Sequence, residues 1–256
     1  MTFSDAFVDA PLPDVPGTRR LDYTHFTVLL DPVRRLAALT AVNIDGDGLR
    51  DLPRRGEWFL DDRVPESEQC GNELYRDNDL DRGHLVRRRD PQWGPDAEAA
   101  GHDTFSYANA APQAADFNQS KELWLGLEDH VLAYADANDH RVSVFTGCVF
   151  AEDDPSYRGV LVPRRFWKVA AWRSSEGLAT AAFVLDQSTM LKPAMTPVRP
   201  APLGRFRTFQ VPVAEVQRLT GIDLGVLEAA DVLEPVAAAR PVETWRRLRS
   251  AGDIRL

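Results

Sequence analysis

The chain has 256 residues, enough for one large domain or two small ones with a sizeable core. Apolar residues make up 44% and charged residues 27%, as in ordinary globular proteins, and no run approaches the ~20 apolar residues that span a bilayer. The net charge of -9 and the pI of about 5.1 argue against a protein that coats nucleic acid, but they leave room for an enzyme with a local basic groove. Residues 1–20 lack the basic start and apolar core of a secretory signal, so we expect a soluble protein of unknown compartment.

The predicted strands follow one another with few helices between them. Residues 1–20 are rich in proline and polar side chains and are expected to form an irregular N-terminal arm, followed by a single domain over residues 21–256. Strands are predicted at residues 25–30, 36–44, 85–86, 104–108, 142–147, 166–172, 178–185 and 206–211. Short turns join the first two strands and the pair on either side of residues 174–177, which predicts antiparallel hairpins. The pattern favours an α+β fold with a mainly antiparallel β-sheet and packed helices.

Two helices and a basic segment complete the predicted elements. A helix is predicted over residues 118–137, where apolar side chains recur at spacings of three and four, namely Leu123, Leu127, Val131 and Tyr134. A second helix is predicted over residues 213–220 and is expected to end at Gly221. Residues 222–256 are expected to form short helices with a basic tip at residues 246–249.

Cysteines and tryptophans carry weaker signals. Cys70 and Cys148 are too few for a disulfide scaffold and are expected to be free thiols, although a single bridge between them stays open. The tryptophans are expected in the core rather than as platforms for nucleobases. Trp93 is the exception and is kept as a candidate for stacking on a nucleobase, because it follows a run of arginines.

The segment Asp81-Arg82-Gly83-His84 carries the strongest chemical signal, together with Asn118 and Glu128 further along the chain. A neutral imidazole can accept a proton from water near pH 7, as hydrolysis of a phosphodiester requires. A magnesium ion keeps several waters and needs few protein ligands, so one asparagine carbonyl can suffice. Each residue alone has a plainer explanation, as a structural histidine, a helix N-cap or a solvated carboxylate. Their ordered combination favours cleavage of a phosphodiester with one bound metal ion.

The Asp-Arg-Gly-His segment resembles the signature of the DNA/RNA non-specific endonucleases, the endonuclease G-like members of the ββα-metal (His-Me finger) group. Later segments resemble that family in the same order, at residues 107–113, 117–119 and 124–128. The likeness extends from about residue 20 to residue 190. It implies a ββα-metal active-site motif within the predicted α+β fold.

The resemblance implies a role for each residue of the metal-dependent reaction. His84 would be the general base that activates water, and Asn118 would hold the magnesium ion, with manganese as a substitute. Glu128 would hold a metal-bound water or orient the site from the same helix. Asn109 would order the loop around His84 beside the substrate.

The resemblance also implies roles for arginines. Arg82 would hold the motif or touch phosphate, and Arg87 and Arg88 would bind substrate. Arg55 precedes a Trp-x-x-Asp element and would stabilise charge on the phosphate, as the corresponding arginine does in the family. Arg54 is the near rival, because the gap to the tryptophan is uncertain by one residue.

Two departures from the family pattern concern the predicted helix. The family often has an arginine one turn after the glutamate, where this chain has Leu132, so another arginine such as Arg87, the metal or water would have to assist the leaving group. Asn118 and Glu128 would lie about 15 Å apart along a regular helix and could not both contact one ion closely. Glu122 is easier to reach geometrically and is kept as second choice, unless the helix bulges or starts after Asn118.

The leading functional hypothesis is a metal-dependent endonuclease that hydrolyses DNA and RNA with little sequence preference and leaves 5′-phosphate ends. One alternative is a catalytically decayed protein that binds nucleic acid or regulates on the same fold, and another is a phosphodiesterase for small nucleotides. The resemblance also suggests that the protein forms a homodimer. Biological role, preference between DNA and RNA, and compartment are left open by the sequence.

Overall fold

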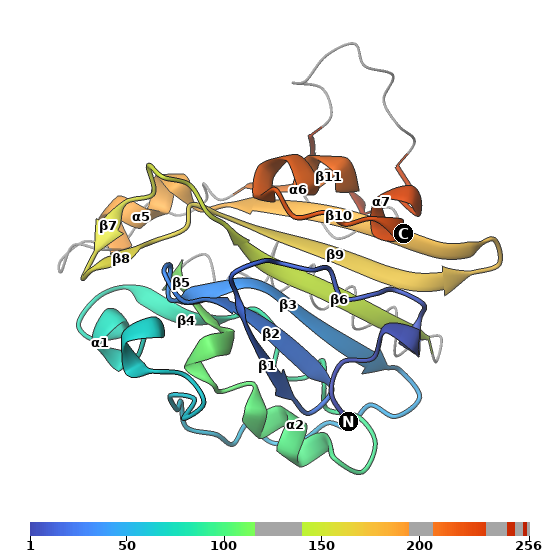
Figure 1. Ribbon diagram of the computed structural model, residues 1–256, viewed down its shortest axis with the longest axis horizontal. Coiled ribbons are helices and arrows are strands. Elements are labelled where there is room, and N and C mark those ends of the chain that lie inside the picture. The colour runs from blue at the N-terminus through green and yellow to red at the C-terminus, as the bar shows by residue number, and fades with distance from the viewer. Residues whose placement is uncertain (116–139, 195–206, 234–244, 249–252, 255–256) are drawn as a thin grey trace.

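The computed structural model describes residues 1–115, 140–194, 207–233, 245–248 and 253–254. Their main feature is an eight-stranded sheet in the order β1-β2-β3-β6-β9-β10-β11-β12 (Figure 1). Every neighbouring pair in it is antiparallel. The strands are β1 Arg19–Tyr23, β2 Phe26–Asp31, β3 Leu36–Asp45, β6 Arg141–Val149, β9 Arg165–Ser174, β10 Gly177–Asp186, β11 Arg207–Val211 and β12 Arg246–Leu248. The predicted α+β fold with a mainly antiparallel sheet is confirmed.

Both faces of the sheet are buried, and each belongs to a different hydrophobic core. Successive side chains of a strand point to opposite faces. On β9, Phe166 and Ala170 therefore join one core, while Trp167 and Val169 join the other. We call these the first-core face and the second-core face of the sheet.

Regular helices cover the second-core face (Figure 1, orange and red). They are α6, Val213–Thr220, and α7, Val226–Ala229, and a short 3-10 turn at Asp5–Phe7 packs against the same core. Gly221 ends α6 in the left-handed conformation, with φ of 71°, and its N–H donates to the carbonyl of Gln217 at 2.8 Å. The predicted helix over residues 213–220 and its glycine stop are confirmed.

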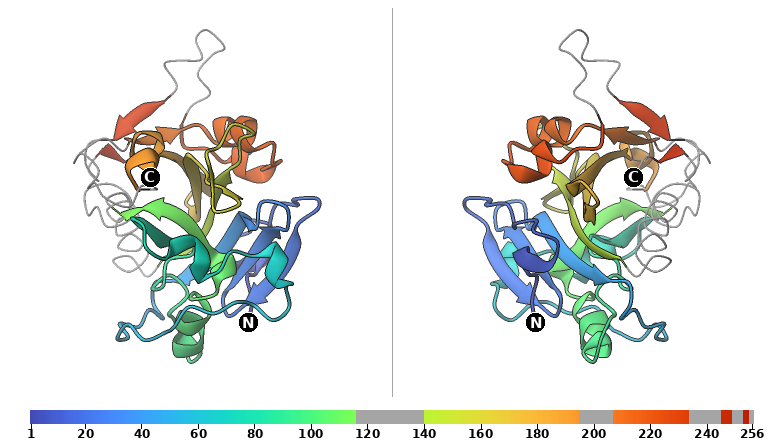
Figure 2. Two further views of the ribbon diagram at one scale, coloured as in Figure 1. Left: turned by 90° about the vertical axis from the view of Figure 1, so that its left-hand side faces the viewer. Right: turned by 90° about the vertical axis from the view of Figure 1, so that its right-hand side faces the viewer.

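The first-core face is covered by short elements and irregular chain (Figure 2). A two-stranded antiparallel sheet, β4 Leu80–His84 with β5 Ala110–Ala114, packs against it. The remaining elements around it are α1 Asn72–Tyr75, α2 Ala97–Asp103, α5 Ser188–Ala194, the 3-10 turns Glu66–Glu68 and Tyr107–Asn109, and the small hairpin β7 Ser156–Tyr157 with β8 Val160–Leu161.

The structure confirms most predicted strands and corrects three predictions. The strand expected at residues 85–86 ends at His84 instead, because the Asp-Arg-Gly-His segment itself pairs with β5. The strand expected at residues 104–108 is a turn after α2, and pairing begins only at Ala110. The basic tip expected at residues 246–249 contains β12, which adds to the edge of the sheet because its backbone pairs with β11.

At the N-terminus, β1 begins at Arg19, and the irregular lead-in buries Phe3 and Val8 in the second core. That residues 1–20 form an arm distinct from a single domain over residues 21–256 stays a prediction. Cys70 and Cys148 are buried and free, which confirms the free thiols. Within the described ranges, no helix combines the length and the apolar character needed to cross a bilayer.

Candidate active site

The two-stranded β4–β5 sheet places His84 at the last residue of β4. His84 lies opposite Ala110, and Gly83 lies opposite Ala111. Immediately beyond the pairing, the N–H of Leu85 donates to the carbonyl of Asn109 at 3.0 Å. The histidine is therefore held by a backbone ladder on one side and meets irregular chain on the other.

Asn109 fixes the chain that leaves His84. Its side chain is fully buried, and its Oδ1 accepts a hydrogen bond from the Val86 N–H at 2.8 Å. Its Nδ2 donates to the carbonyls of Val86 and Thr104, both at 3.0 Å. All of these bonds go to the protein backbone, so in this structure Asn109 orders the loop around His84.

Gly83 is required by the packing of Gln113. A Cβ atom at position 83 would lie 2.1 Å from Cδ of Gln113, far inside van der Waals contact. Gln113 is itself fully buried, and neither its amide oxygen nor its amide nitrogen hydrogen-bonds to any described residue. A buried polar group without a partner carries a free-energy cost, so this amide is a notable feature beside the histidine motif.

Two aromatic rings pack against the imidazole of His84. The ring centroid of Trp58 lies 4.7 Å from that of His84, and the ring centroid of Phe105 lies 5.3 Å away and nearly perpendicular. Nε2 of His84 is shielded from solvent and makes no hydrogen bond within the described ranges. Burial of the ring, with the positive charges of Arg54 and Arg88, lowers the pKa of His84 to about 3. The imidazole is therefore neutral at physiological pH.

The arginines around His84 occupy different positions. Arg88 donates to the carbonyl of Leu52 at 3.0 Å and to Oε1 of Gln92 at 3.1 Å. Its pKa is lowered, first by burial and then by the nearby charge of Arg54. Arg54 thus acts electrostatically on both His84 and Arg88, whereas Arg55 lines a cavity of about 220 Å³ with Leu52, Pro53, Gln92, Glu98, Gly101 and His102.

Arg82 and Arg87 face other groups. The guanidinium of Arg82 lies over the rings of Tyr75 and Tyr107, at 5.3 Å and 5.9 Å from their centroids, and donates to the Tyr107 hydroxyl at 3.3 Å. It also donates to Oδ1 of Asn72 in α1, so Arg82 joins β4 to that helix. Arg87 is partly buried, and together with Lys168 it opposes the burial that raises the pKa of Asp90.

Several predicted site residues lie outside the described ranges, namely Asn118, Glu122, Glu128 and Leu132, with the whole predicted helix over residues 118–137. Within the described ranges there is no group of three or more histidine, cysteine or acidic residues that could hold a metal ion. The expected ligand Asn118 lies outside these ranges, and an amide oxygen with water is a donor set that hard cations accept.

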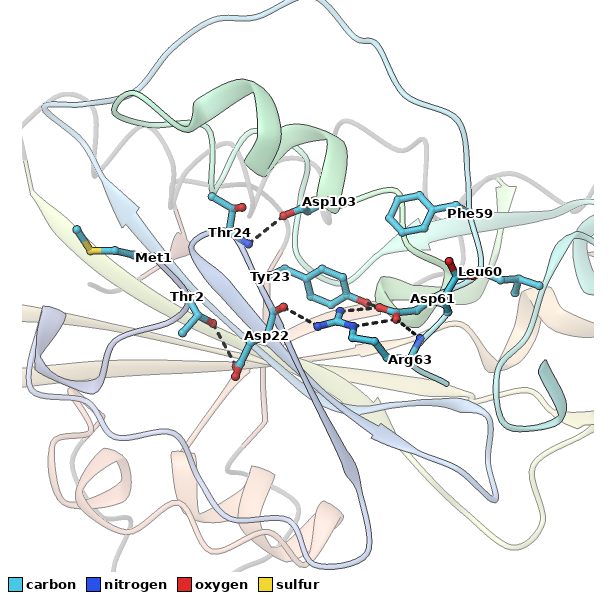
Figure 3. Close-up of a pocket in the computed structure, with 11 residues that line it drawn as sticks. Met1, Thr2, Asp22, Tyr23, Thr24, Phe59, Leu60, Asp61, Arg63 and Asp103 are labelled. Carbon is cyan, nitrogen blue, oxygen red and sulfur yellow. Dashed lines mark hydrogen bonds and ion pairs between the residues drawn. The ribbon is translucent and has the colours of Figure 1, made fainter. Parts of the chain in front are cut away.

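The larger cavity, of about 600 Å³, lies beside β1 and is acidic (Figure 3). Four carboxylates line it, from Asp22, Asp61, Asp62 and Asp103, against the single guanidinium of Arg63. Such a charge balance repels phosphate, so this cavity is not suited to nucleic acid. It matters for the site because Phe59 and Leu60, in its wall, follow Trp58 directly.

Sequence reasoning missed two neighbours of the histidine, Trp58 and Phe105, and the neighbour of Gly83, Gln113. Trp58 was expected simply as a core residue, although its place in the Trp-x-x-Asp element was a usable signal. Phe105 carried no signal of its own, because only tertiary contacts bring it to His84. Gln113 ends the segment at residues 107–113 that resembles the family, but no role was assigned to it, because its contact with Gly83 is also tertiary. Trp93, followed as a base-stacking candidate, stacks instead on His25 at 3.5 Å between ring centroids.

Comparison with known proteins supplies independent information. The family described as DNA/RNA non-specific endonuclease matches residues 10–228. An uncharacterized protein of Sinorhizobium fredii, y4fB, is 41% identical over 249 residues, which cover 91% of this chain and 37% of that protein. The chain therefore spans little more than a third of that relative's length. Mitochondrial endonuclease G of Homo sapiens is 28% identical over 226 residues, covering 81% of this chain and 70% of that protein.

A solved structure shares the fold. The crystal structure of the EndoG/EndoGI complex, which addresses inhibition of EndoG, matches with a TM-score of 0.65. The match covers 86% of this chain and 89% of that chain, at 20% sequence identity. At this identity the likeness speaks for the fold alone.

Proposed function

The chain belongs to the DNA/RNA non-specific endonuclease family, and we propose that it hydrolyses phosphodiester bonds in DNA and RNA with little sequence preference. The observation that carries this proposal is His84, a neutral imidazole at the end of β4 beside the positive charges of Arg54 and Arg88. A neutral ring has its lone pair available for a proton, and the adjacent positive charges can bind a phosphate. The negative charge of that bound phosphate would offset the arginines and raise the pKa of the imidazole toward the range of a working base.

In the proposed mechanism, His84 accepts a proton from a water molecule as that water attacks phosphorus. The bond between phosphorus and the 3′ oxygen breaks, the leaving oxygen takes a proton, and the products are a 5′-phosphate and a 3′-hydroxyl. Arg54 and Arg88 stabilise negative charge on the phosphate, which grows toward the pentacovalent transition state. The sequence left Arg55 and Arg54 as candidates for stabilising charge on the phosphate. Arg54 is the better placed of these two, because its charge acts on both His84 and Arg88.

A magnesium ion, or manganese in its place, would be held by Asn118, with Glu128 acting through water. A divalent cation in this place would supply neutralisation of the phosphate and leaving oxygen. The surroundings of His84 are compatible with this, since Nε2 of His84 and the amide of Gln113 have no hydrogen-bond partner within the described ranges and can bond to water held by such an ion. Low sequence preference follows if recognition rests on phosphate contacts, which carry no base information.

The test is digestion of plasmid DNA and total RNA by purified wild-type protein and by His84→Ala, with magnesium and with EDTA. We expect magnesium-dependent cleavage of both substrates by the wild type and a loss of about 10²- to 10⁴-fold in the variant, as for removal of a general base. His140→Ala serves as the matched control, because it removes a histidine that the mechanism does not use.

Three results would contradict the proposal. Wild-type activity in His84→Ala would exclude His84 as the base. Binding of DNA without cleavage, under conditions where the fold is intact, would favour a decayed binding protein. Cleavage of small nucleotide diesters but not polymers would favour a small-molecule phosphodiesterase. The salt dependence of the rate would separate a nuclease from such a phosphodiesterase, because binding of a nucleic-acid polymer releases counterions.

A further inference from the structure

The segment that carries Trp58 is docked on the segment that carries Phe105. The N–H of Phe59 donates to the carbonyl of Phe105 at 3.2 Å, and the N–H of Tyr107 donates to the carbonyl of Phe59 at 2.9 Å. Phe59 and Ser106 thereby form an isolated parallel bridge. Two stretches of irregular chain, far apart in sequence, are thus held together next to the two rings that pack against His84.

Gly56 makes this close approach of the two segments feasible. Its φ of 152° lies outside the range that side chains favour, and a Cβ atom there would lie 2.4 Å from a ring carbon of Phe105. The backbone at position 56 therefore rests on the face of Phe105. This contact fixes the start of the segment just before Trp58.

A buried polar network fixes the other end of the segment (Figure 3). The Tyr23 hydroxyl donates to Oδ2 of Asp61 at 2.6 Å and shares a hydrogen bond with Oγ of Ser106 at 2.9 Å. Arg63 pairs with the same carboxylate at 2.6 Å. The Tyr23 hydroxyl therefore connects Asp61, in the chain that follows Trp58, to Ser106, the residue that follows Phe105.

A second histidine in the molecule shows what is unusual about His84. His25 also stacks on a tryptophan, Trp93, but its Nδ1 is hydrogen-bonded to the carbonyl of Pro91 at 2.8 Å. Nε2 of His84 has no such bond in the described ranges. On the Nε2 side, the His84 ring is thus held by packing against Trp58 and Phe105 rather than by a hydrogen bond to the described chain.

We propose that Trp58, backed by Phe105, is a positioning residue for His84, which holds the imidazole in a fixed orientation and shields one side of it from water. This inference rests on the proposed function, in which His84 is the base. Trp58 does not touch the substrate in this assignment; it acts through the histidine. The Asp61 network and Gly56 are the supports that keep Trp58 in place.

Activity is the first readout, with Trp58→Ala and Trp58→Phe compared in plasmid cleavage. Misplacement of a catalytic group by about 1 Å can cost about 10²-fold, so we expect kcat to fall by about 10- to 100-fold in Trp58→Ala. KM should change little, because substrate phosphates are bound by arginines. Trp58→Phe keeps an aromatic face and should recover most of the lost kcat, a rescue that a general loss of stability would not show.

The pH profile is a second readout, because burial and the charges of Arg54 and Arg88 act on the same ring. In Trp58→Ala the imidazole gains water, so the acid limb of kcat/KM should move toward the ordinary pKa of histidine, about 6.5. Trp93→Ala is the matched control: it removes the same side chain from the other tryptophan–histidine stack. It should lower stability without moving the acid limb.

A third readout does not depend on activity. Diethyl pyrocarbonate modifies neutral imidazoles that are accessible, and mass spectrometry of peptides gives the rate at each histidine. Relative to His102, whose side chain is 62% exposed, modification of His84 should be slow in the wild type and several-fold faster in Trp58→Ala. If Trp58→Ala does not fold, Trp58→Leu keeps apolar bulk without the ring and takes its place.

The outcomes separate the two proposals. Wild-type kcat, an unmoved acid limb and unchanged modification of His84 in the Trp58 variants would overturn the positioning role while leaving the nuclease intact. If the wild type cleaves no nucleic acid, the proposed function fails, and the modification rates still decide whether Trp58 shields His84.

Discussion

The two faces of the central sheet are both buried, but they are built differently. On the second-core face, α6 and α7 pack regular apolar surfaces, with Val213 and Leu227 fully buried. On the first-core face, short strands and turns cover the sheet, and buried polar groups without described partners, such as Nε2 of His84 and the amide of Gln113, lie among them.

The contrast shows how one sheet can serve stability and chemistry at once. A regular helix pairs most of its own backbone N–H and C=O groups, so only its side chains need to pack. Irregular chain needs side chains such as that of Asn109 to form hydrogen bonds with its backbone groups. On the first-core face, irregular chain brings a histidine and arginines close to one another. Both faces still bury an extensive apolar core, so the irregular covering does not come at the expense of packing.

The largest effect expected on the second-core face is one of stability. Phe145 is fully buried in that core and packs edge-on against Phe3, with ring centroids 5.6 Å apart. Phe145→Ala should lower the free energy of unfolding by about 3–5 kcal/mol, the usual cost of removing a buried phenylalanine side chain. Denaturant melts give this value, and kcat measured well below the melting temperature should stay at the wild-type level. A matching loss of kcat would mean that the two faces are not separate in function.

The next effect concerns the charges on the first-core face. Arg54→Ala should lower kcat/KM by about 10²-fold, because it removes a charge that acts beside His84 on the developing phosphate charge. Arg55→Ala should cost much less, since Arg55 lines the separate cavity near His102. Arg218→Ala on α6, which breaks an exposed ion pair with Glu215, is the control on the opposite face and should leave kcat/KM unchanged. The reverse ranking of Arg54 and Arg55 would restore the assignment made from the sequence.

The sequence predicted the second-core face better than the first. Helix α6, its stop at Gly221 and the long hairpin of β9 and β10 follow from local patterns: apolar spacing, a glycine and a short turn. Such signals are contained within a few residues. They were sufficient because each of these elements satisfies its own backbone hydrogen bonds or pairs with its neighbour in the chain.

On the first-core face the local signals failed where distant segments decide the structure. The strand at β4 includes His84 because residues 110–114 pair with it, not because of its own composition. Residues 104–108 look apolar enough for a strand, but Asn109 and Ser106 bond the local backbone and produce a turn. The motif identified His84, and the contacts of Trp58 and Phe105 with it could be found only in three dimensions.

The pH dependence gives a smaller effect and tests the packing of His84 directly. An ordinary histidine with a pKa of about 6.5 would lose about tenfold of its neutral form between pH 7.5 and 5.5. Burial beside Arg54 and Arg88 lowers the pKa of His84 to about 3, so the ring stays neutral over this range. The acid limb of kcat/KM for the wild type should therefore lie below pH 6.5, as measured with a short oligonucleotide at constant magnesium and ionic strength.

The same shift has a consequence for stability, with a definite sign. Below pH 6.5 the unfolded chain protonates His84 while the native chain does not, so the native state loses stability as the pH falls toward 3, by up to about 1.4 kcal/mol per pH unit from this group. His84→Ala removes this contribution, so the difference in unfolding free energy between variant and wild type should grow in favour of the variant on acidification. An acid limb near pH 6.5 together with parallel stability curves would mean that His84 is solvated in solution, and the distinction between a packed face and a chemical face would then lose its main support.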